Sequence, residues 1–510
     1  MRFGSNYGIF TGNHQKMDFD LDSIKKFYQF KSKKKNTSFQ NISEEIAIDL
    51  DLDFLFFKLD NTFSKIGRQY LYSKFRIIEK ENDPFFGNYT EFFKDKKDDF
   101  IENELKKLNN HKDYETIHLI ENEIFVNKNY LNFAKISLLV LILIIVLSFF
   151  AKQMFLFLVP LFLANAFFHY KNKNYVEYYN SIIWRIQKTL SAAKKISKKN
   201  TLFKTEYKNI KLKKLENSIW TTYLTNQLAK NEFLVVFWLI SETIQIVFNL
   251  EIFDFNRKVK ILNRSKQELF KIFEYIGKID SAINIAKIQK EYDICIPKFN
   301  HEKRIDILGI YHPLIENCIK NDLQLFGKSI ILTGSNMSGK TSFMRSFAVN
   351  SIVAQSFGFC FAEKFEVPFM QILSSISIHD DISENKSYYL EEVLRVKKFL
   401  ETDSEFNLIL IDEIFKGTNT KERIAISKAV LKSLNLPHNI IFITTHDLEI
   451  ANFLKNFNYE LYYFAEEVTD NQMKFTYKLH VGINSKTNAI KILELCNYPK
   501  NIIEESYKLL

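Results

Sequence analysis

The sequence predicts a mixed fold class: a domain of long helices that contains an apolar helical hairpin, followed by an α/β domain. The 510 residues include seven prolines and thirteen glycines, and only Pro84 and Pro160 precede Pro297. Long helices are therefore expected up to about residue 290. After Pro297, three short apolar runs are predicted to be strands, and a helical segment follows the first of them.

Composition limits the function classes only loosely. Lys and Arg total 70 against 60 Asp and Glu, a formal charge of +10. This surplus fits contact with nucleic acid or an anionic membrane, but a chain rich in Lys, Asn, Ile and Phe can also reflect genomic base composition. The four cysteines lie far apart without a CxxC pair, which predicts neither a disulfide framework nor a zinc site.

The first 48 residues are predicted to form a basic N-terminal segment. It contains KSKKK at residues 31–35. A charge run of this kind is usually a solvated face or a flexible arm, and contact with DNA is the alternative. Near a membrane-inserted hairpin it could also lie on anionic lipid headgroups.

Residues 136–168 are the least polar part of the chain. Ile136 to Ala151 carries no charge, Lys152 and Gln153 interrupt, and Met154 to Phe168 is again apolar. Each half has about 15 residues, slightly fewer than the roughly 20 of a membrane-spanning helix, and is apolar on all sides. We expect two membrane spans joined by a tight turn at Lys152. A buried helical hairpin, or a patch covered by a partner, is the alternative.

The flanks of this hairpin predict its orientation. Lys128 and Lys135 precede it, and Lys171 and Lys173 follow it, so both flanks should face the cytoplasm. This predicts a cytoplasmic protein anchored in the cytoplasmic membrane by residues 136–168. A second apolar stretch, at residues 233–250, contains Glu242 and other polar breaks and is expected to be a core helix.

The segment GSNMSGKT satisfies the phosphate-loop pattern G-x-x-x-x-G-K-[ST]. An apolar strand precedes it and a helix follows it, which is the context that a phosphate loop requires. Lys340 would reach the β- and γ-phosphates of ATP, and the Thr341 hydroxyl would bind Mg²⁺. The predicted nucleotide-binding residues are Gly334, Ser335, Asn336, Met337, Ser338, Gly339, Lys340, Thr341 and Ser342.

Two further apolar strands end in polar residues suited to ATP hydrolysis. Residues 407–420, NLILIDEIFKGTNT, place Asp412 and Glu413 at a strand end, and NIIFITTH ends in His446. Asp412 would join Thr341 at Mg²⁺, and Glu413 would orient and deprotonate the attacking water. His446 would sense the γ-phosphate.

These segments resemble the MutS mismatch-repair family. TGSNMSGKT is similar to its phosphate loop, LILIDEIFKGTNT to its Asp-Glu strand and the loop that follows, and FITTHD to its switch-histidine segment. DDISENKSYYLEEV, at 380–393, is similar to its signature loop. LDNTFSKIGRQYLYSKFR, at 59–76, resembles the start of its lever domain; there the matching residues are Leu59, Asp60, Thr62, Gly67, Arg68 and Leu71.

The resemblance implies a lever domain at residues 49–300 and an ABC-type P-loop ATPase domain at residues 301–510 that ends in dimerisation helices. It also implies a homodimer with composite sites, in which Ser387 of one subunit meets the nucleotide of the other. ATP with Mg²⁺ would close the dimer, and hydrolysis would reopen it and move the levers.

The sequence departs from the family in ways that bear on function. Only about 50 residues precede the lever pattern, too few for the domains that read a mismatch. Residues 136–168 stand where the family has its DNA clamp, and Asn385 to Tyr388 replace the usual Gly-x-Ser-Thr. We therefore expect a short, membrane-associated variant that lacks the mismatch-recognition domain.

Two functions remain open from the sequence. The first is a mismatch-repair-like ATPase that binds DNA without sequence specificity and is anchored in the membrane. The second is a membrane-anchored ABC-type mechanochemical ATPase that moves a protein partner and binds no DNA.

Overall fold

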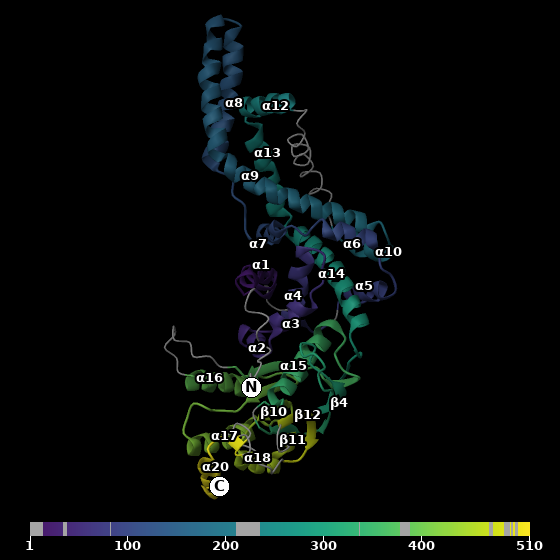
Figure 1. Cartoon of the computed structure of the whole chain (residues 1–510). Coiled ribbons are helices and arrows are strands. Elements are labelled where there is room, and N and C mark those ends of the chain that lie inside the picture. The colour runs from purple at the N-terminus through teal and green to yellow at the C-terminus, as the bar shows by residue number, and fades with distance from the viewer. Residues whose placement is uncertain are drawn as a thin grey trace. The chain divides into compact units, whose positions relative to one another are not determined.

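The computed structural model describes residues 14–33, 38–81, 83–210, 235–335, 337–377, 388–468, 473–483 and 498–509, with residues 490, 493 and 494 between the last two ranges. Its described part is mostly helical and also contains mixed sheets, which confirms the predicted mixed class (Figure 1). It forms two compact units. Unit 1 draws on residues 1–34, 61–73 and 83–286, and unit 2 on residues 35–60, 74–82 and 287–510.

The described part of unit 1 consists of helices and connecting loops. Its helices are α1 (His14–Lys33), α5 (Pro84–Asp95), α6 (Asp99–Lys106), η1 (His111–Glu115), α7 (Thr116–Glu121), α8 (Lys128–Ser148), η2 (Lys152–Phe157), α9 (Leu158–Ser197), α10 (Thr201–Lys208), α12 (Val235–Phe248) and α13 (Leu250–Arg264). Helices α4 (Lys65–Arg76) and α14 (Lys266–Glu291) lie mainly in unit 1 and end in unit 2. Local caps fix several starts; Asp83, for example, accepts a hydrogen bond from the amide of Phe85 with Pro84 at the first helical position.

A buried carboxylate joins α4 to α14 inside unit 1. Asp280 on α14 accepts hydrogen bonds from the backbone amides of Phe63 (2.9 Å) and Ser64 (2.8 Å), which precede α4. Gly67 makes this approach possible, since a Cβ there would lie 2.0 Å from Oδ2 of Asp280. The glycine that the lever pattern singled out is therefore a packing requirement.

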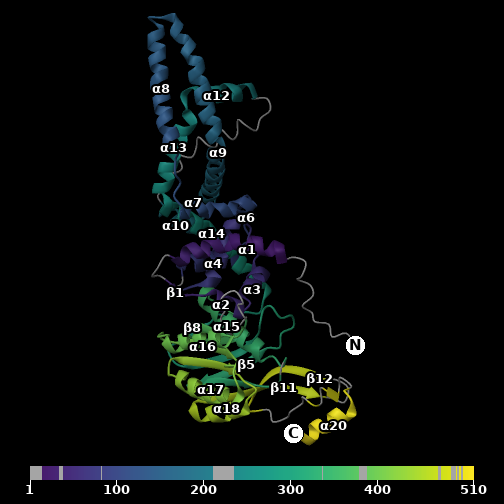
Figure 2. The same cartoon turned by 90° about the vertical axis from the view of Figure 1, so that its left-hand side faces the viewer.

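Helices α8 and α9 form the predicted helical hairpin, with the turn at residues 149–151 (Figure 2). Leu141 and Ile144 are buried, whereas most apolar side chains on the other faces are exposed; Leu143 is 56% and Phe150 86% accessible. Both helices are long and apolar enough to cross a membrane, by length and composition only. The alternative of a hairpin buried in the core of the fold is wrong for these described residues.

One smaller expectation for unit 1 is corrected. Residues 239–248 do not form a core helix, because α12 leaves Leu239 and Ile240 more than half exposed. The helix contacts the rest of unit 1 through one face, which includes Glu242 and the buried Ile246. Lys31 and Lys33 end α1 and contact Glu274 and Glu121 through ion pairs of 3.6 and 3.3 Å. The Lys33 side chain is 71% exposed, as expected of a solvated face, and Lys34 and Lys35 lie outside the described residues.

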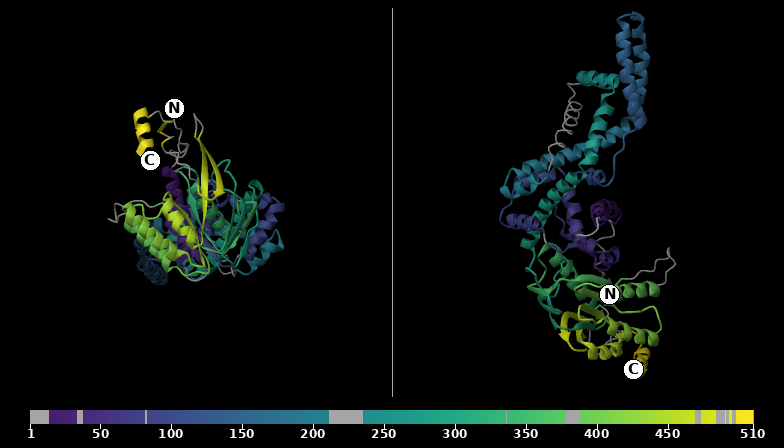
Figure 3. Two further views of the ribbon diagram at one scale, coloured as in Figure 1. Left: turned by 90° about the horizontal axis from the view of Figure 1, so that it is seen from below. Right: turned by 180° about the vertical axis from the view of Figure 1, so that it is seen from behind.

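Unit 2 is built on a six-stranded sheet with the order β12-β11-β6-β10-β9-β8. Five strands run parallel and β12 pairs antiparallel with β11 at one edge, where the two strands form a long ribbon (Figure 3, left). The strands are β6 (Ser329–Thr333), β8 (Gln371–Ser375), β9 (Asn407–Asp412), β10 (Asn439–Thr444), β11 (Tyr459–Val468) and β12 (Met473–Val481). β6 and β10 are buried along their whole length, which explains their continuous apolar runs.

A second, four-stranded sheet has the order β3-β7-β4-β5. Its strands are β3 (Lys298–Asn300), β4 (Arg304–Ile310), β5 (Asn321–Phe326) and β7 (Lys364–Pro368). The helices of unit 2 include α15 (Lys340–Phe357), α16 (Tyr388–Glu401), α17 (Thr420–Leu434), α18 (Leu448–Leu454), η4 (Lys455–Phe457) and α20 (Lys500–Leu509). The expectation of an α/β domain in this part of the chain is confirmed.

Residues 38–59 pack on the six-stranded sheet. They form β1 (Ser38–Asn41), which pairs with β2 (Ile77–Glu79), then α2 (Glu44–Asp49) and α3 (Leu52–Leu59). The Gln40 side chain bonds both the amide and the carbonyl of Ile372 on β8. Asp49 is fully buried and accepts from the amide of Ser377 (2.7 Å), just beyond β8. These contacts make the segment part of unit 2.

Candidate functional site

The phosphate-loop segment lies between buried strand β6 and helix α15. Gly334 and Gly339 have φ values of 138° and 106°, which a residue with a Cβ rarely adopts. A Cβ at Gly334 would lie 3.0 Å from the carbonyl oxygen of Phe464, and one at Gly339 would lie 3.1 Å from the Tyr477 ring. The two glycines of the pattern therefore stand where the backbone needs them.

Lys340 is folded back over this loop. Its Nζ donates hydrogen bonds to the carbonyl oxygens of Gly334 and Ser335, each at 2.8 Å. The side chain is buried, and this burial lowers the pKa of Lys340, although the carboxylates of Glu413 and Asp412 oppose the effect. The ammonium is thus held in the concavity of the loop, where phosphate oxygens would replace the carbonyls as its partners.

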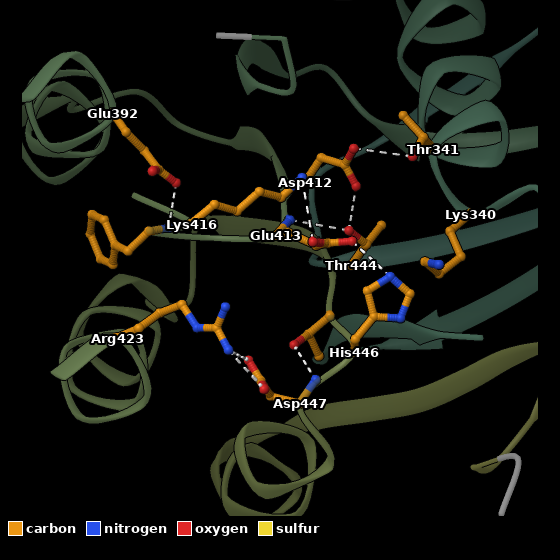
Figure 4. A network of polar contacts seen from close by, with 12 residues as sticks. Lys340, Thr341, Glu392, Asp412, Glu413, Lys416, Arg423, Thr444, His446 and Asp447 are labelled. Atoms are coloured by element: carbon orange, nitrogen blue, oxygen red, sulfur yellow. Dashed lines mark hydrogen bonds and ion pairs between the residues drawn. The ribbon is translucent and has the colours of Figure 1, made fainter. Parts of the chain in front are cut away.

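Asp412 and Thr341 come together from β9 and α15. The Thr341 hydroxyl donates to Oδ2 of Asp412 at 3.2 Å (Figure 4). The hydroxyl of Thr444, the last residue of β10, donates to Oδ1. Because β6, β9 and β10 are parallel and adjacent, their carboxyl ends meet at one edge of the sheet, and this edge gathers the polar groups.

Glu413 and His446 are in hydrogen-bond contact at the same edge. Oε1 of Glu413 lies 2.8 Å from Nε2 of His446, and Oε2 lies 3.4 Å from the Lys416 ammonium (Figure 4). The hydrogen bond with His446 is the largest cause that lowers the pKa of Glu413 to about 2, and Lys416 adds to it against the opposing effect of burial. Glu413 also has a φ of 55°, and its amide donates to Thr444. Its carboxylate is therefore ionised and fixed.

Five of the predicted residues need separate mention. Met337 has a φ of 68° and its side chain is exposed, and Ser342 lies in the first turn of α15, where its carbonyl accepts from the hydroxyl of Ser346. Ser338 is buried with no hydrogen-bond partner for its hydroxyl among the described residues. Asn336 and Ser387 lie outside the described residues.

Sequence reasoning missed several residues of the site. Thr444 lies within the quoted segment FITTHD, so its position at a strand end beside Asp412 could have been noticed. Glu466 on β11 accepts a hydrogen bond from the Ser335 hydroxyl, and Arg423 on α17 pairs with Asp447 at 3.1 Å. These residues come from distant parts of the chain, and no local spacing indicates that they are close to the loop.

These donors fit ATP with Mg²⁺. The glycine loop and the N-terminus of α15 offer backbone amides to phosphate oxygens, with Lys340 as the cation. Thr341 and Asp412 supply a hydroxyl and a carboxylate, and Mg²⁺ prefers oxygen ligands of this kind. Mg²⁺ sites commonly have only one or two protein ligands, and water and phosphate oxygens complete the coordination. Bound Mg²⁺ would neutralise charge on the phosphates, and Glu413 is the nearby carboxylate that could accept a proton from water.

Comparison with known proteins assigns this domain. The sequence profile of the family called MutS domain V matches residues 330–510, from β6 to the C-terminal helix α20. Residues 330–510 therefore form a domain of the MutS family. The MutS resemblance predicted from the motifs is confirmed.

Relatives in the MutS family match about half of the chain. It is 30% identical over 264 residues to the DNA mismatch repair protein MutS of Acholeplasma laidlawii, which is 50% of this chain and 31% of that protein. It is 28% identical over 259 residues to the protein of the same name from Thermotoga petrophila and 31% over 268 residues to that of Petrotoga mobilis. In these two cases 49% of this chain and 32% of the relative are matched. The matches thus span about a third of the length of these MutS relatives.

Proposed function

We propose that this MutS-family chain is a Mg²⁺-dependent P-loop ATPase of the ABC type. One observation carries the proposal: Lys340 in the glycine loop, the Thr341–Asp412 pair at 3.2 Å and the Glu413–His446 pair at 2.8 Å lie together at one sheet edge. Lys340 binds the phosphates, Thr341 and Asp412 hold Mg²⁺, Glu413 takes a proton from the attacking water, and His446 senses the γ-phosphate. The phosphates are bound by the loop from Gly334 to Ser342, including Asn336 and Met337.

The chain works as a homodimer in this proposal. Each site takes Ser387 from the other subunit, and the C-terminal helices contribute to dimerisation. The predicted set of site residues contains no arginine. The negative charge that develops on the phosphate during hydrolysis must therefore be stabilised by Lys340, Mg²⁺ and the partner's signature loop. ATP binding closes the dimer and hydrolysis reopens it, which moves the levers.

DNA, bound without sequence specificity, is the substrate that we propose. The relatives carry the name DNA mismatch repair protein, and the chain has a formal charge of +10. The exposed hairpin at residues 136–168 supports a membrane anchor on the cytoplasmic side. The same hairpin also keeps the second candidate function open: a membrane-anchored ATPase that moves a protein partner without DNA.

Salt-dependent DNA binding distinguishes the two functions. We expect the full chain in detergent to bind a 40-base-pair duplex, with an affinity that falls by at least tenfold between about 50 and 200 mM salt, because lysines and arginines release counterions from the phosphates. Fluorescence anisotropy measures this, with ATP hydrolysis by the same preparation as the control for folding. Full ATPase activity without duplex binding at 50 mM salt would exclude the DNA function and favour the protein partner.

A further inference from the structure

The hairpin of α8 and α9 presents apolar side chains on every face except the one where the two helices touch. Large apolar residues that are at least 40% exposed on α8 and the turn are Ile136, Leu139, Ile142, Leu143, Ile145, Val146, Leu147, Phe149 and Phe150. Those on η2 and α9 are Phe155, Leu156, Phe157, Val159, Leu163 and Phe167. A single protein partner would cover one side of such a hairpin. Exposure on all sides fits hydrocarbon, which surrounds it completely.

A polar layer marks the base of the apolar part. The Ser137 hydroxyl donates to Oδ1 of Asn165 at 2.6 Å, and the Asn165 amide donates to the carbonyl of Val247 at 3.1 Å. One helical turn farther along α9, the His169 ring lies between the carboxylates of Glu242 (3.2 Å) and Glu251 (3.0 Å). Between Ser137 and Asn165, which include the turn of the hairpin, Lys152 is the only charged residue. The layer therefore separates the charged part of these helices from their apolar part.

The hairpin above this layer is short. From Ser137 to the end of α8 at Ser148 the helix rises about 17 Å, and residues 149–151 then turn the chain back. The hydrocarbon core of a bilayer is about 30 Å thick. The tip carries the highly exposed Phe149 and Phe150, which are suited to hydrocarbon and not to the far headgroups. A hairpin inserted as far as this layer would therefore end inside the hydrocarbon core.

Helix α12 projects sideways from the hairpin (Figure 3, right), and the Asn165 side chain of the polar layer bonds the carbonyl of Val247 near its end. Glu242 on α12 fixes it there through His169 and through the Lys173 ammonium at 2.8 Å. The side chains on its free face follow helical spacing and are exposed: Leu239, Ile240, Ile244 and Phe248. A helix held crosswise with a free apolar face is suited to lying in the plane of a membrane interface.

We propose that unit 1 binds one leaflet of an anionic bilayer, with residues 136–168 as a re-entrant hairpin and α12 flat in the headgroup region of the same leaflet. This proposal rests on the membrane anchoring in the proposed function. It differs from the two membrane spans expected from the sequence, because the hairpin enters and leaves the bilayer on the same side. Lysines at the base face anionic lipid headgroups. Lys128, Lys135 and Lys171 are exposed there, and Tyr170 beside them is 58% exposed, as expected of an aromatic residue at the interface.

Depth-dependent fluorescence quenching tests the proposal on the full chain. Its four cysteines are first replaced by serine (C295S, C318S, C360S, C496S). A single cysteine is then introduced by Phe150→Cys at the tip, Ile240→Cys on α12 or Leu448→Cys on α18 as the control, and labelled with the fluorophore NBD. The three proteins are reconstituted into vesicles of phosphatidylcholine and phosphatidylglycerol at 3:1, which contain spin labels either near the headgroup or deep in the acyl chain.

We expect the probe at position 150 to be quenched at least twofold more by the deep label than by the headgroup label. The probe at position 240 should show the reverse order, and the control at position 448 should be quenched by neither. Equal ATPase activity of the three labelled proteins verifies that each is folded.

Other outcomes overturn the proposal in distinguishable ways. Preferential headgroup quenching at position 150 would show that the tip crosses to the far surface, so the hairpin spans the bilayer and only the re-entrant insertion fails. Unquenched fluorescence at position 240 would remove α12 from the membrane surface. If neither position 150 nor position 240 is quenched, membrane anchoring itself fails, while the ATPase assignment is unaffected.

Discussion

At the scale of single residues, the site is held together by charges and hydroxyls at three strand ends. Glu413 illustrates how the surroundings set a side chain's properties: its hydrogen bond with His446, helped by Lys416, lowers its pKa to about 2. A depressed carboxylate pKa stabilises the folded protein fully above its ordinary pKa of 4.5, and this contribution is lost as the pH falls toward 2. At neutral pH Glu413 is therefore ionised and can accept hydrogen bonds from water.

Replacing His446 by alanine should make the activity sensitive to acid. The variant loses the hydrogen-bond donor that contributes most to the low pKa, so the pKa of Glu413 should rise toward 4.5. Phosphate release measured from pH 4 to 8 should show no acidic limb from Glu413 in the unchanged protein, whereas His446→Ala should lose half of its own maximal rate near about pH 4.5. Lys416→Ala, which removes a weaker contribution, is the matched control and should shift less. Superimposable profiles would mean that Glu413 is not the base.

At the scale of elements, buried polar contacts decide how neighbouring helices and strands join. The pair of α4 and α14 depends on Asp280, which receives the backbone amides of Phe63 and Ser64, and on Gly67, which leaves room for it. Unit 2 uses the same device where Asp49 receives the amide of Ser377 beyond β8. Such buried carboxylates are fixed hydrogen-bond acceptors for backbone amides, and they specify one arrangement of the elements.

Asp280→Ala should destabilise the protein by about 3 kcal/mol, because two buried amides lose their acceptor at about 1–3 kcal/mol each. Urea unfolding followed by circular dichroism measures the change in the free energy of unfolding. Asp95→Ala, at an exposed aspartate at the end of α5, is the matched control and should change it by less than about 0.5 kcal/mol. A similar loss for both variants would show that the Asp280 contacts do not hold α4 against α14.

At the scale of the whole chain, the sequence predicted what local patterns determine. The apolar runs of β6, β9 and β10 and the glycine spacing of the loop indicated the strands, the turn and the polar residues at their ends. The two apolar runs of residues 136–168, interrupted at Lys152 and Gln153, indicated the hairpin. Each of these features depends on neighbours in sequence and follows from periodicity or backbone requirements.

Long-range pairing could not be predicted in this way. The sheet order β12-β11-β6-β10-β9-β8 depends on pairings such as that of Phe442 with Ile330, and Gln40 contacts Ile372, 332 positions farther along the chain. The place of Glu466 beside Ser335 follows from the pairing of β11 with β6. The exposed face of α12 was not predicted, because an apolar stretch that contains Glu242 has the composition of a core helix. The structure shows that Glu242 contacts His169 on one face of α12, whereas the apolar side chains on another face are exposed.

We propose that ATP binding at the edge formed by β6, β9 and β10 closes a homodimer. Hydrolysis of this ATP, with Glu413 as the base, then reopens the dimer. The most direct measurement is light scattering coupled to size exclusion of Glu413→Gln in detergent, with and without ATP and Mg²⁺. We expect the variant to bind ATP, to hydrolyse it at least a hundredfold more slowly than the unchanged protein, and to shift to a dimer only when ATP is present. Lys340→Ala, which should not bind ATP, is the control and should not shift. Turnover at the unchanged rate, or bound ATP without a dimer, would contradict the claim.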